Sequence, residues 1–139
     1  MKLTNLIAAL AGLTSVMGVK TFSSLSTNAN RPDLARCLGE LRKELEKTPE
    51  ANERRDYQCG SYMWQVGGPK EWGREEENLK VFNKCETELT EGAHMGHDWF
   101  LCRWRDFWGF RVVSWTPIGT HLCPECHPPS FHPEPKPEA

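Results

Sequence analysis

The apolar positions of the chain first indicate a helix near the N-terminal third. Leucines recur at spacings of four, three and four residues, which places them on one stripe of a helix running from residue 31 to about 47. The residues of this stripe are Leu34, Leu38, Leu41 and Leu45. Asn30-Arg31-Pro32-Asp33 is typical of a helix start with Asn30 as the cap, and Thr48-Pro49 is typical of a helix end.

A second apolar stripe predicts a helix over about residues 75–91. Leu79, Phe82 and Leu89 share one face of this segment, with Cys85 beside them. The first turn is acidic, which suits the positive end of the helix dipole. Gly92 follows directly, and we expect it to end the helix.

Aromatic and β-branched residues mark the predicted strands. Residues 57–66 are expected to form one strand, which ends at a Gly-Gly-Pro turn. Residues 99–105 and 109–115 are expected to form two more, joined near residues 106–109. Residues 124–139 hold six of the ten prolines and predict an exposed, disordered tail. The order of elements favours a small α+β domain over residues 31–123, with two helices packed on a short antiparallel sheet.

The N-terminal segment is typical of a secretory signal. Lys2 supplies a positive start, an apolar run follows over residues 3–16, and cleavage is expected after Gly18. The run of about 14 residues is shorter than the roughly 20 that a membrane span requires. Residues 1–18 are therefore predicted to be a signal peptide, and the polar residues 19–30 a flexible leader. We expect a secreted, extracellular protein without a membrane span.

The six cysteines all follow this segment and predict a disulfide framework, because an even number in a secreted chain is usually paired. They are Cys37, Cys59, Cys85, Cys102, Cys123 and Cys126. Six cysteines allow 15 pairings. Cys37 and Cys85 lie on inward helical faces, so a bridge between the two helices is one expectation. Cys123 and Cys126 are expected to enter two separate disulfides that anchor the tail.

The charge balance gives no general attraction to nucleic acid or to anionic membranes. The chain has 17 basic and 19 acidic residues, and removing the signal takes away one basic residue, Lys2. An acidic excess of this kind does not drive binding to phosphates. Arg54-Arg55 could serve as a dibasic processing site. No cofactor is indicated by any motif.

A histidine-aspartate pair offers one alternative function, a small secreted hydrolase of ribonuclease or phospholipase type. His97 and Asp98, with His94 nearby, would supply the acid-base chemistry, and His121 and Glu125 are further candidates. The His-Asp pair resembles that of the secreted phospholipases A2, although the residue three positions before the histidine is His94 and not the cysteine of that family.

A Cys-x-x-Cys motif offers a second alternative, a metal site. Cys123 and Cys126 have the spacing of a zinc knuckle, and His121 and His127 flank them. Two thiolates on a tight turn reach one tetrahedral metal. The oxidising secretory route opposes this assignment, because it joins thiols into disulfides.

The strand predicted at 99–105 suggests a binding surface. Alternation along a strand puts Trp99, Arg103 and Arg105 on one face, and the other face carries Phe100, Cys102 and Trp104. Trp108 extends the aromatic and basic run. One face is therefore expected to be solvent-exposed (wet) and cationic, while the face with the cysteine is expected to be buried.

The overall layout resembles the small secreted cysteine-rich proteins of filamentous fungi, many of which are candidate effectors. The signal, the size, the six cysteines and the tripeptide Tyr57-Gln58-Cys59 carry this resemblance. It implies a secreted interaction protein that acts on a host or extracellular protein without catalysis. No site residue is carried over from it.

Overall fold

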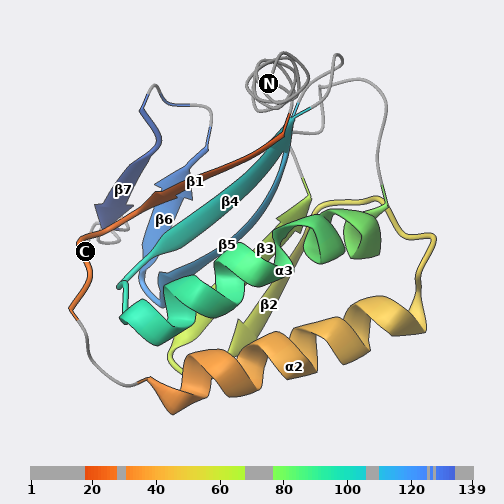
Figure 1. Cartoon of the computed structure of the whole chain (residues 1–139), viewed down its shortest axis with the longest axis horizontal. Coiled ribbons are helices and arrows are strands. Elements are labelled where there is room, and N and C mark those ends of the chain that lie inside the picture. Colours follow the sequence, from red (N-terminus) through yellow and green to blue (C-terminus); the bar gives the residue numbers. More distant parts are fainter. Residues whose placement is uncertain are drawn as a thin grey trace, which may run out of the picture.

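The computed structural model of the protein describes residues 18–27, 31–67, 77–105, 110–124, 126 and 128–133. They form an α+β fold in which two helices cover one face of a five-stranded antiparallel sheet (Figure 1). A two-stranded hairpin packs on the other face. This confirms the predicted fold class. The predicted signal segment, apart from Gly18, lies outside the described residues.

The sheet has the strand order β1–β4–β5–β3–β2 and all of its neighbouring strands are antiparallel. We call its two faces the helix side and the hairpin side. The helices are α2 (Pro32–Lys47) and α3 (Asn78–Met95). The strands of the sheet are β1 (Val19–Ser23), β2 (Arg55–Cys59), β3 (Tyr62–Gly67), β4 (Phe100–Arg105) and β5 (Phe110–Pro117). The hairpin consists of β6 (Thr120–Cys123) and β7 (Ser130–Pro133).

Helix α2 agrees closely with the prediction. All four leucines of the stripe are buried, and Cys37 is buried beside them. Pro32 occupies the first turn, where its missing N–H costs no hydrogen bond. Arg31 stands at the cap position without a side-chain cap, and the predicted cap Asn30 lies outside the described residues.

Helix α3 both begins and ends later than predicted. It begins at Asn78, so its first turn is not acidic as expected, and Gly92 does not end it. The helix continues to Met95 and stops at Gly96, whose φ of 70° is left-handed. Gly92 is buried inside the helix, where its lack of a side chain allows close packing. A Cβ atom there would lie 2.6 Å from ring carbons of Phe100. The glycine therefore lets the ring of β4 approach the helix backbone.

The segment predicted as a single strand over residues 57–66 is a tight hairpin of β2 and β3. Cys59 pairs directly with Tyr62, and Gly60 adopts a left-handed φ of 59° at the turn. The two strands expected further on are confirmed as β4 and β5. Residues 106–109, where the sequence predicts their connection, lie outside the described residues.

Both segments predicted to lack structure contribute strands. The expected flexible leader forms β1, which pairs with β4 along its whole length. The expected disordered tail forms β7, in which Phe131 pairs with Leu122 of β6. Phe131 and Phe22 supply apolar side chains to the hairpin side, which explains why these short polar segments are held. Residues 134–139 of the tail lie outside the described residues.

The larger core lies between the helices and the sheet. Its biggest fully buried side chains are Trp64 and Trp115 from adjacent strands and Phe82 from α3. Trp115 stacks on Phe100 with ring centroids 4.9 Å apart. Trp64 lies 5.1 Å from Trp115. A smaller cluster on the hairpin side joins buried residues of β4 and β5 to the hairpin, namely Leu101, Phe110, Val112 and Leu122.

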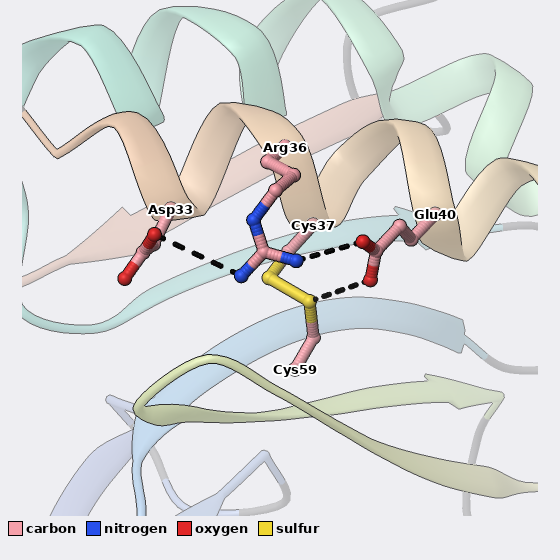
Figure 2. The surroundings of a disulfide bond; sticks show 5 residues. All are labelled: Asp33, Arg36, Cys37, Glu40 and Cys59. Carbon is pink, nitrogen blue, oxygen red and sulfur yellow. Dashed lines mark hydrogen bonds and ion pairs between the residues drawn. A yellow bond between two sulfur atoms is a disulfide. The ribbon is translucent and has the colours of Figure 1, made fainter.

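The cysteines form three disulfides, which confirms that the domain is disulfide-stabilised. Cys37–Cys59 joins α2 to β2 (Figure 2), and Cys85–Cys102 joins α3 to β4. The expected bridge between Cys37 and Cys85 is therefore wrong, because each helical cysteine faces the sheet rather than the other helix. The expectation that Cys123 and Cys126 enter separate disulfides is also wrong, since they bond to each other.

No helix in the described part of the chain is long and apolar enough to cross a membrane.

Candidate anion-binding face

Strand β4 alternates as predicted, but the side expected to be wet is partly covered by the hairpin, and of its β4 residues only Arg105 is exposed. Phe100, Cys102 and Trp104 pack on the helix side, and Leu101 lies in the cluster on the hairpin side. Arg103 shares the hairpin side with Leu101, as alternation requires. The two-residue period of β4 therefore decides which of its side chains lie on the hairpin side.

Arg103 sits between two aromatic rings. Its guanidinium carbon lies 5.2 Å from the ring centroid of Phe22 and 5.3 Å from that of Phe110. Its Nε atom is buried and has no hydrogen-bond partner among the described residues. Burial lowers the pKa of Arg103 from its ordinary value, and the charge of Arg105 lowers it further. The cation is thus favourably stacked but poorly neutralised.

Two further cations lie beside Arg103. Lys20 is its direct partner in the register of β1 and β4, and Arg105 lies two positions further along β4. The ammonium of Lys20 sits 5.2 Å from the Phe22 centroid. We call Lys20, Arg103 and Arg105 the cationic face. Within the part of the chain that the structure describes, none of the three forms an ion pair with a carboxylate.

Several cations elsewhere in the described residues, by contrast, form ion pairs with carboxylates. Arg36 of α2 lies 2.7 Å from Glu40 and 3.7 Å from Asp33 (Figure 2). Lys47 lies 2.6 Å from Glu44. Adjacent like charges without a counter-charge repel one another, so a bound anion would relieve the cationic face. This arrangement can bind carboxylate, phosphate or sulfate groups.

Trp99, the aromatic member of the predicted surface, has a different role. It stacks on Phe131 of β7 with centroids 6.1 Å apart and an interplanar angle of 7°. Trp99 therefore fastens the hairpin, although it remains half-buried. Trp108 lies outside the described residues. Lys20 and Phe22 were missed because they fall in the segment predicted to be a flexible leader, where Val-Lys-Thr-Phe shows no apolar–polar alternation that would indicate a strand.

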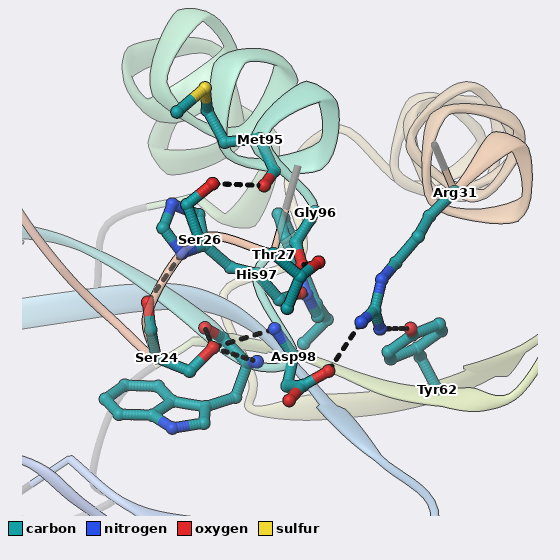
Figure 3. A network of polar contacts seen from close by, with 11 residues as sticks. Ser24, Ser26, Thr27, Arg31, Tyr62, Met95, Gly96, His97 and Asp98 are labelled. Atoms are coloured by element: carbon teal, nitrogen blue, oxygen red, sulfur yellow. Dashed lines mark hydrogen bonds and ion pairs between the residues drawn. The ribbon is translucent and has the colours of Figure 1, made fainter. Parts of the chain in front are cut away.

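The hydrolase candidates His97 and Asp98 belong to a network that holds residues 24–27 and Arg31 on the domain (Figure 3). His97 Nδ1 donates to the carbonyl oxygen of Ser24 at 2.6 Å. Asp98 forms an ion pair with Arg31 at 2.6 Å. Arg31 also donates to the Tyr62 hydroxyl, and that hydrogen bond, followed by the one to Asp98, raises the pKa of Arg31.

The same network extends to the end of helix α3. The hydroxyl of Ser26 donates to the Met95 carbonyl, and that of Thr27 to the Gly96 carbonyl, each at 2.6 Å (Figure 3). These bonds satisfy carbonyls that a helix end leaves unpaired. His97 and Asp98 thus have structural partners, and neither is the other's hydrogen-bond partner.

His94 is not brought together with the other two. It lies exposed on α3 and borders a shallow depression with Thr90 and Glu91. His97 borders a separate depression between β1 and α3, of about 290 Å³. The three residues therefore do not assemble into one acid-base site.

The cysteines predicted as metal ligands are not free thiolates. Cys123 and Cys126 form a disulfide, which has no thiolate to offer a metal. His121 lies exposed on β6, whereas Glu125 and His127 lie outside the described residues. In the described ranges, no group of three or more His, Cys, Asp and Glu side chains could hold a metal ion.

A groove of about 430 Å³ lies between α2 and β2 and was not predicted. The Cys37–Cys59 disulfide lines it, with Trp64 among the other lining residues. The buried indole N–H of Trp64 has no acceptor among the described residues. Glu40 Oε2 lies 3.1 Å from Cys59 Sγ (Figure 2). A disulfide sulfur carries no hydrogen, so we regard this as a close carboxylate–sulfur contact rather than a thiol hydrogen bond.

No protein-family model, curated protein or solved structure matches the chain.

Proposed function

We propose that this is a secreted, effector-like interaction protein that binds an acidic segment of an extracellular or host protein without catalysis. The observation that carries the proposal is the cationic face, in which Lys20, Arg103 and Arg105 lie together without a carboxylate partner in the described residues. A partner's carboxylates would supply the missing charge.

The geometry favours a protein partner. Strand β1 lies at one edge of the sheet, so its outer backbone groups have no neighbouring strand among the described residues. An extended peptide can pair with such an edge while its side chains meet alternate residues of the strand. Lys20 would then meet acidic side chains directly. The acidic balance of the whole chain opposes a general attraction to nucleic acid.

Secretion is part of the proposal and has two supports. The predicted signal peptide stands at the N-terminus, and the six cysteines are joined in three disulfides. Disulfides persist in oxidising compartments and in secreted proteins. The resemblance to fungal candidate effectors supports the role of an interaction protein acting on a host.

The test measures binding of a synthetic ten-residue peptide of alternating aspartate and valine to the full secreted chain. We expect binding that weakens with added salt, because surface charges are screened. The double variant Lys20→Glu/Arg105→Glu should bind about tenfold more weakly, since each exposed pair contributes up to about 1 kcal/mol. Both residues are exposed, so the fold should survive the change.

A matched control reverses two exposed cations elsewhere, Lys43→Glu/Arg54→Glu. It changes the net charge equally and should retain peptide binding. Equal loss in both double variants would show that only net charge matters and would overturn the assigned face. Tighter binding of a single-stranded RNA than of the peptide would overturn the protein partner. Turnover of RNA or phospholipid that is lost on His97→Ala would instead support the hydrolase alternative.

A further inference from the structure

We propose that His121 and His132, on the hairpin β6–β7, form a two-histidine binding site for a divalent transition-metal ion such as Zn²⁺ or Cu²⁺. The two residues are direct partners in the antiparallel register of the hairpin. Both are exposed, so an ion can reach them from solvent. The site is independent of the cationic face and of any thiolate.

The separation of the two rings suits a shared metal. Directly opposed residues of an antiparallel pair have Cβ atoms about 4.5–5.5 Å apart, which lets their side chains meet. Two imidazole nitrogens bound about 2.0–2.1 Å from a tetrahedral zinc ion place the ring centres about 5 Å apart. The centroids of His121 and His132 are 5.5 Å apart, with the rings tilted by 39°. Only a small side-chain adjustment is needed.

A neighbouring hydroxyl orients one of the ligands. Ser130 Oγ lies 2.9 Å from His132 Nε2. When Nε2 donates its hydrogen to this oxygen, Nδ1 is left as the nitrogen that can bind the metal. Metal-binding histidines commonly donate their second ring N–H to such a partner, which fixes the tautomer and the ring orientation. Ser130 is thus a positioning residue for His132.

The nearby disulfide supports the backbone of this site. Cys123, two residues after His121, is bonded to Cys126 in the connection between β6 and β7. The bond shortens the connection between the strands, and the pairing of β6 with β7 holds the histidines in register. Two imidazoles leave the remaining coordination positions to water or to a ligand from another molecule. Imidazole suits zinc and copper, whereas Mg²⁺ and Ca²⁺ prefer oxygen ligands.

The experiment titrates Zn²⁺, and separately Cu²⁺, into the full secreted chain and follows binding by calorimetry. We expect one ion per chain and no comparable binding of Mg²⁺. His121→Asn and His132→Asn should each weaken binding about 10- to 100-fold, because losing one of two linked ligands removes the intramolecular contact. A second readout is the shift of the histidine ring signals in NMR spectra, which Zn²⁺ should cause at both residues.

His94→Asn is the matched control, since His94 is also exposed but lies on helix α3. It should leave the affinity unchanged. The proposal is overturned if either hairpin variant binds Zn²⁺ and Cu²⁺ as tightly as the natural chain, or if His94→Asn weakens binding equally. Circular dichroism of each variant checks that the fold is kept, and the NMR signals of His121 and His132 test the site even in the unaltered protein.

Discussion

The helix side and the hairpin side of the sheet are built differently. On the helix side, two disulfides connect helices to strands, and Cys37, Cys85 and Cys102 are fully buried in a large aromatic core. On the hairpin side, the cluster is small, and the Cys123–Cys126 disulfide spans only three positions in sequence. The contacts on the helix side thus stabilise the fold, whereas the hairpin side carries the proposed binding residues.

This difference indicates which surface residues can be substituted without loss of the fold. The cationic face and the histidine pair both project from the hairpin side or its hairpin. Lys20, Arg105, His121 and His132 are all exposed. Substitutions at exposed positions usually change stability by less than about 0.5 kcal/mol. Binding properties can therefore vary on this side while the core on the other side stays constant.

The largest expected effect comes from removing one disulfide on each side. Cys85→Ala/Cys102→Ala should lower the free energy of unfolding by about 3–5 kcal/mol, because it opens a long loop and leaves a cavity. Both of these cysteines are fully buried. Cys123→Ala/Cys126→Ala should cost less than about 2 kcal/mol, since a short loop loses little entropy on closure.

Urea denaturation followed by tryptophan fluorescence measures both variants, and an unchanged m value shows that the unfolding free energies are comparable. The second double variant also serves as the control for the loss of a disulfide as such. A larger loss at Cys123–Cys126 than at Cys85–Cys102 would contradict the division between the two sides.

A smaller effect is expected from two glycines that both lie inside helices. Gly92→Ala should destabilise the protein by about 1–3 kcal/mol, because the added methyl group meets the Phe100 ring. Gly39→Ala in α2 should stabilise it by up to about 1 kcal/mol, since nothing lies within 4 Å of the new atom. Thermal denaturation distinguishes the two directions, and stabilisation by both changes would show that Phe100 can move away.

Sequence patterns predicted the parts of the fold where the local signal and the packing agree. The leucine stripe of α2 is an example, because its period alone identifies the buried face. The alternation around Arg103 likewise predicted which side chains share a face. Gly92 shows the limit. A helix-ending glycine and a glycine kept small for a ring from another strand look the same in sequence, and only the position of Phe100 distinguishes them.

The other misses have the same cause, which is contact between residues distant in sequence. Strand β1 is short and partly polar, and it is held by its pairing with β4 about 80 positions later. The disulfide partners were set by which helix lies over which strand, which no local pattern reveals. The histidine pair was missed because His132 lies in the segment predicted to be disordered, and only the hairpin register brings it beside His121.

The smallest effect compares the two buried tryptophans on the helix side. Trp115 Nε1 donates to the His97 carbonyl at 3.3 Å, whereas Trp64 Nε1 has no acceptor in the described part of the chain. Both are almost completely buried, so Trp64→Phe and Trp115→Phe remove similar volumes. Trp115→Phe should cost about 1 kcal/mol more, because it leaves a carbonyl unpaired while Trp64→Phe removes a donor without an acceptor.

Urea denaturation, followed by far-ultraviolet circular dichroism because the changes remove a fluorophore, measures this difference. An equal loss would mean that the hydrogen bond to the His97 carbonyl contributes little, and that the contacts of the His97 ring with Ser24 and of Asp98 with Arg31 keep that segment in place. A larger loss at Trp64 would mean that its indole N–H has an acceptor in solution, which would identify the groove between α2 and β2 as a hydrated or occupied site.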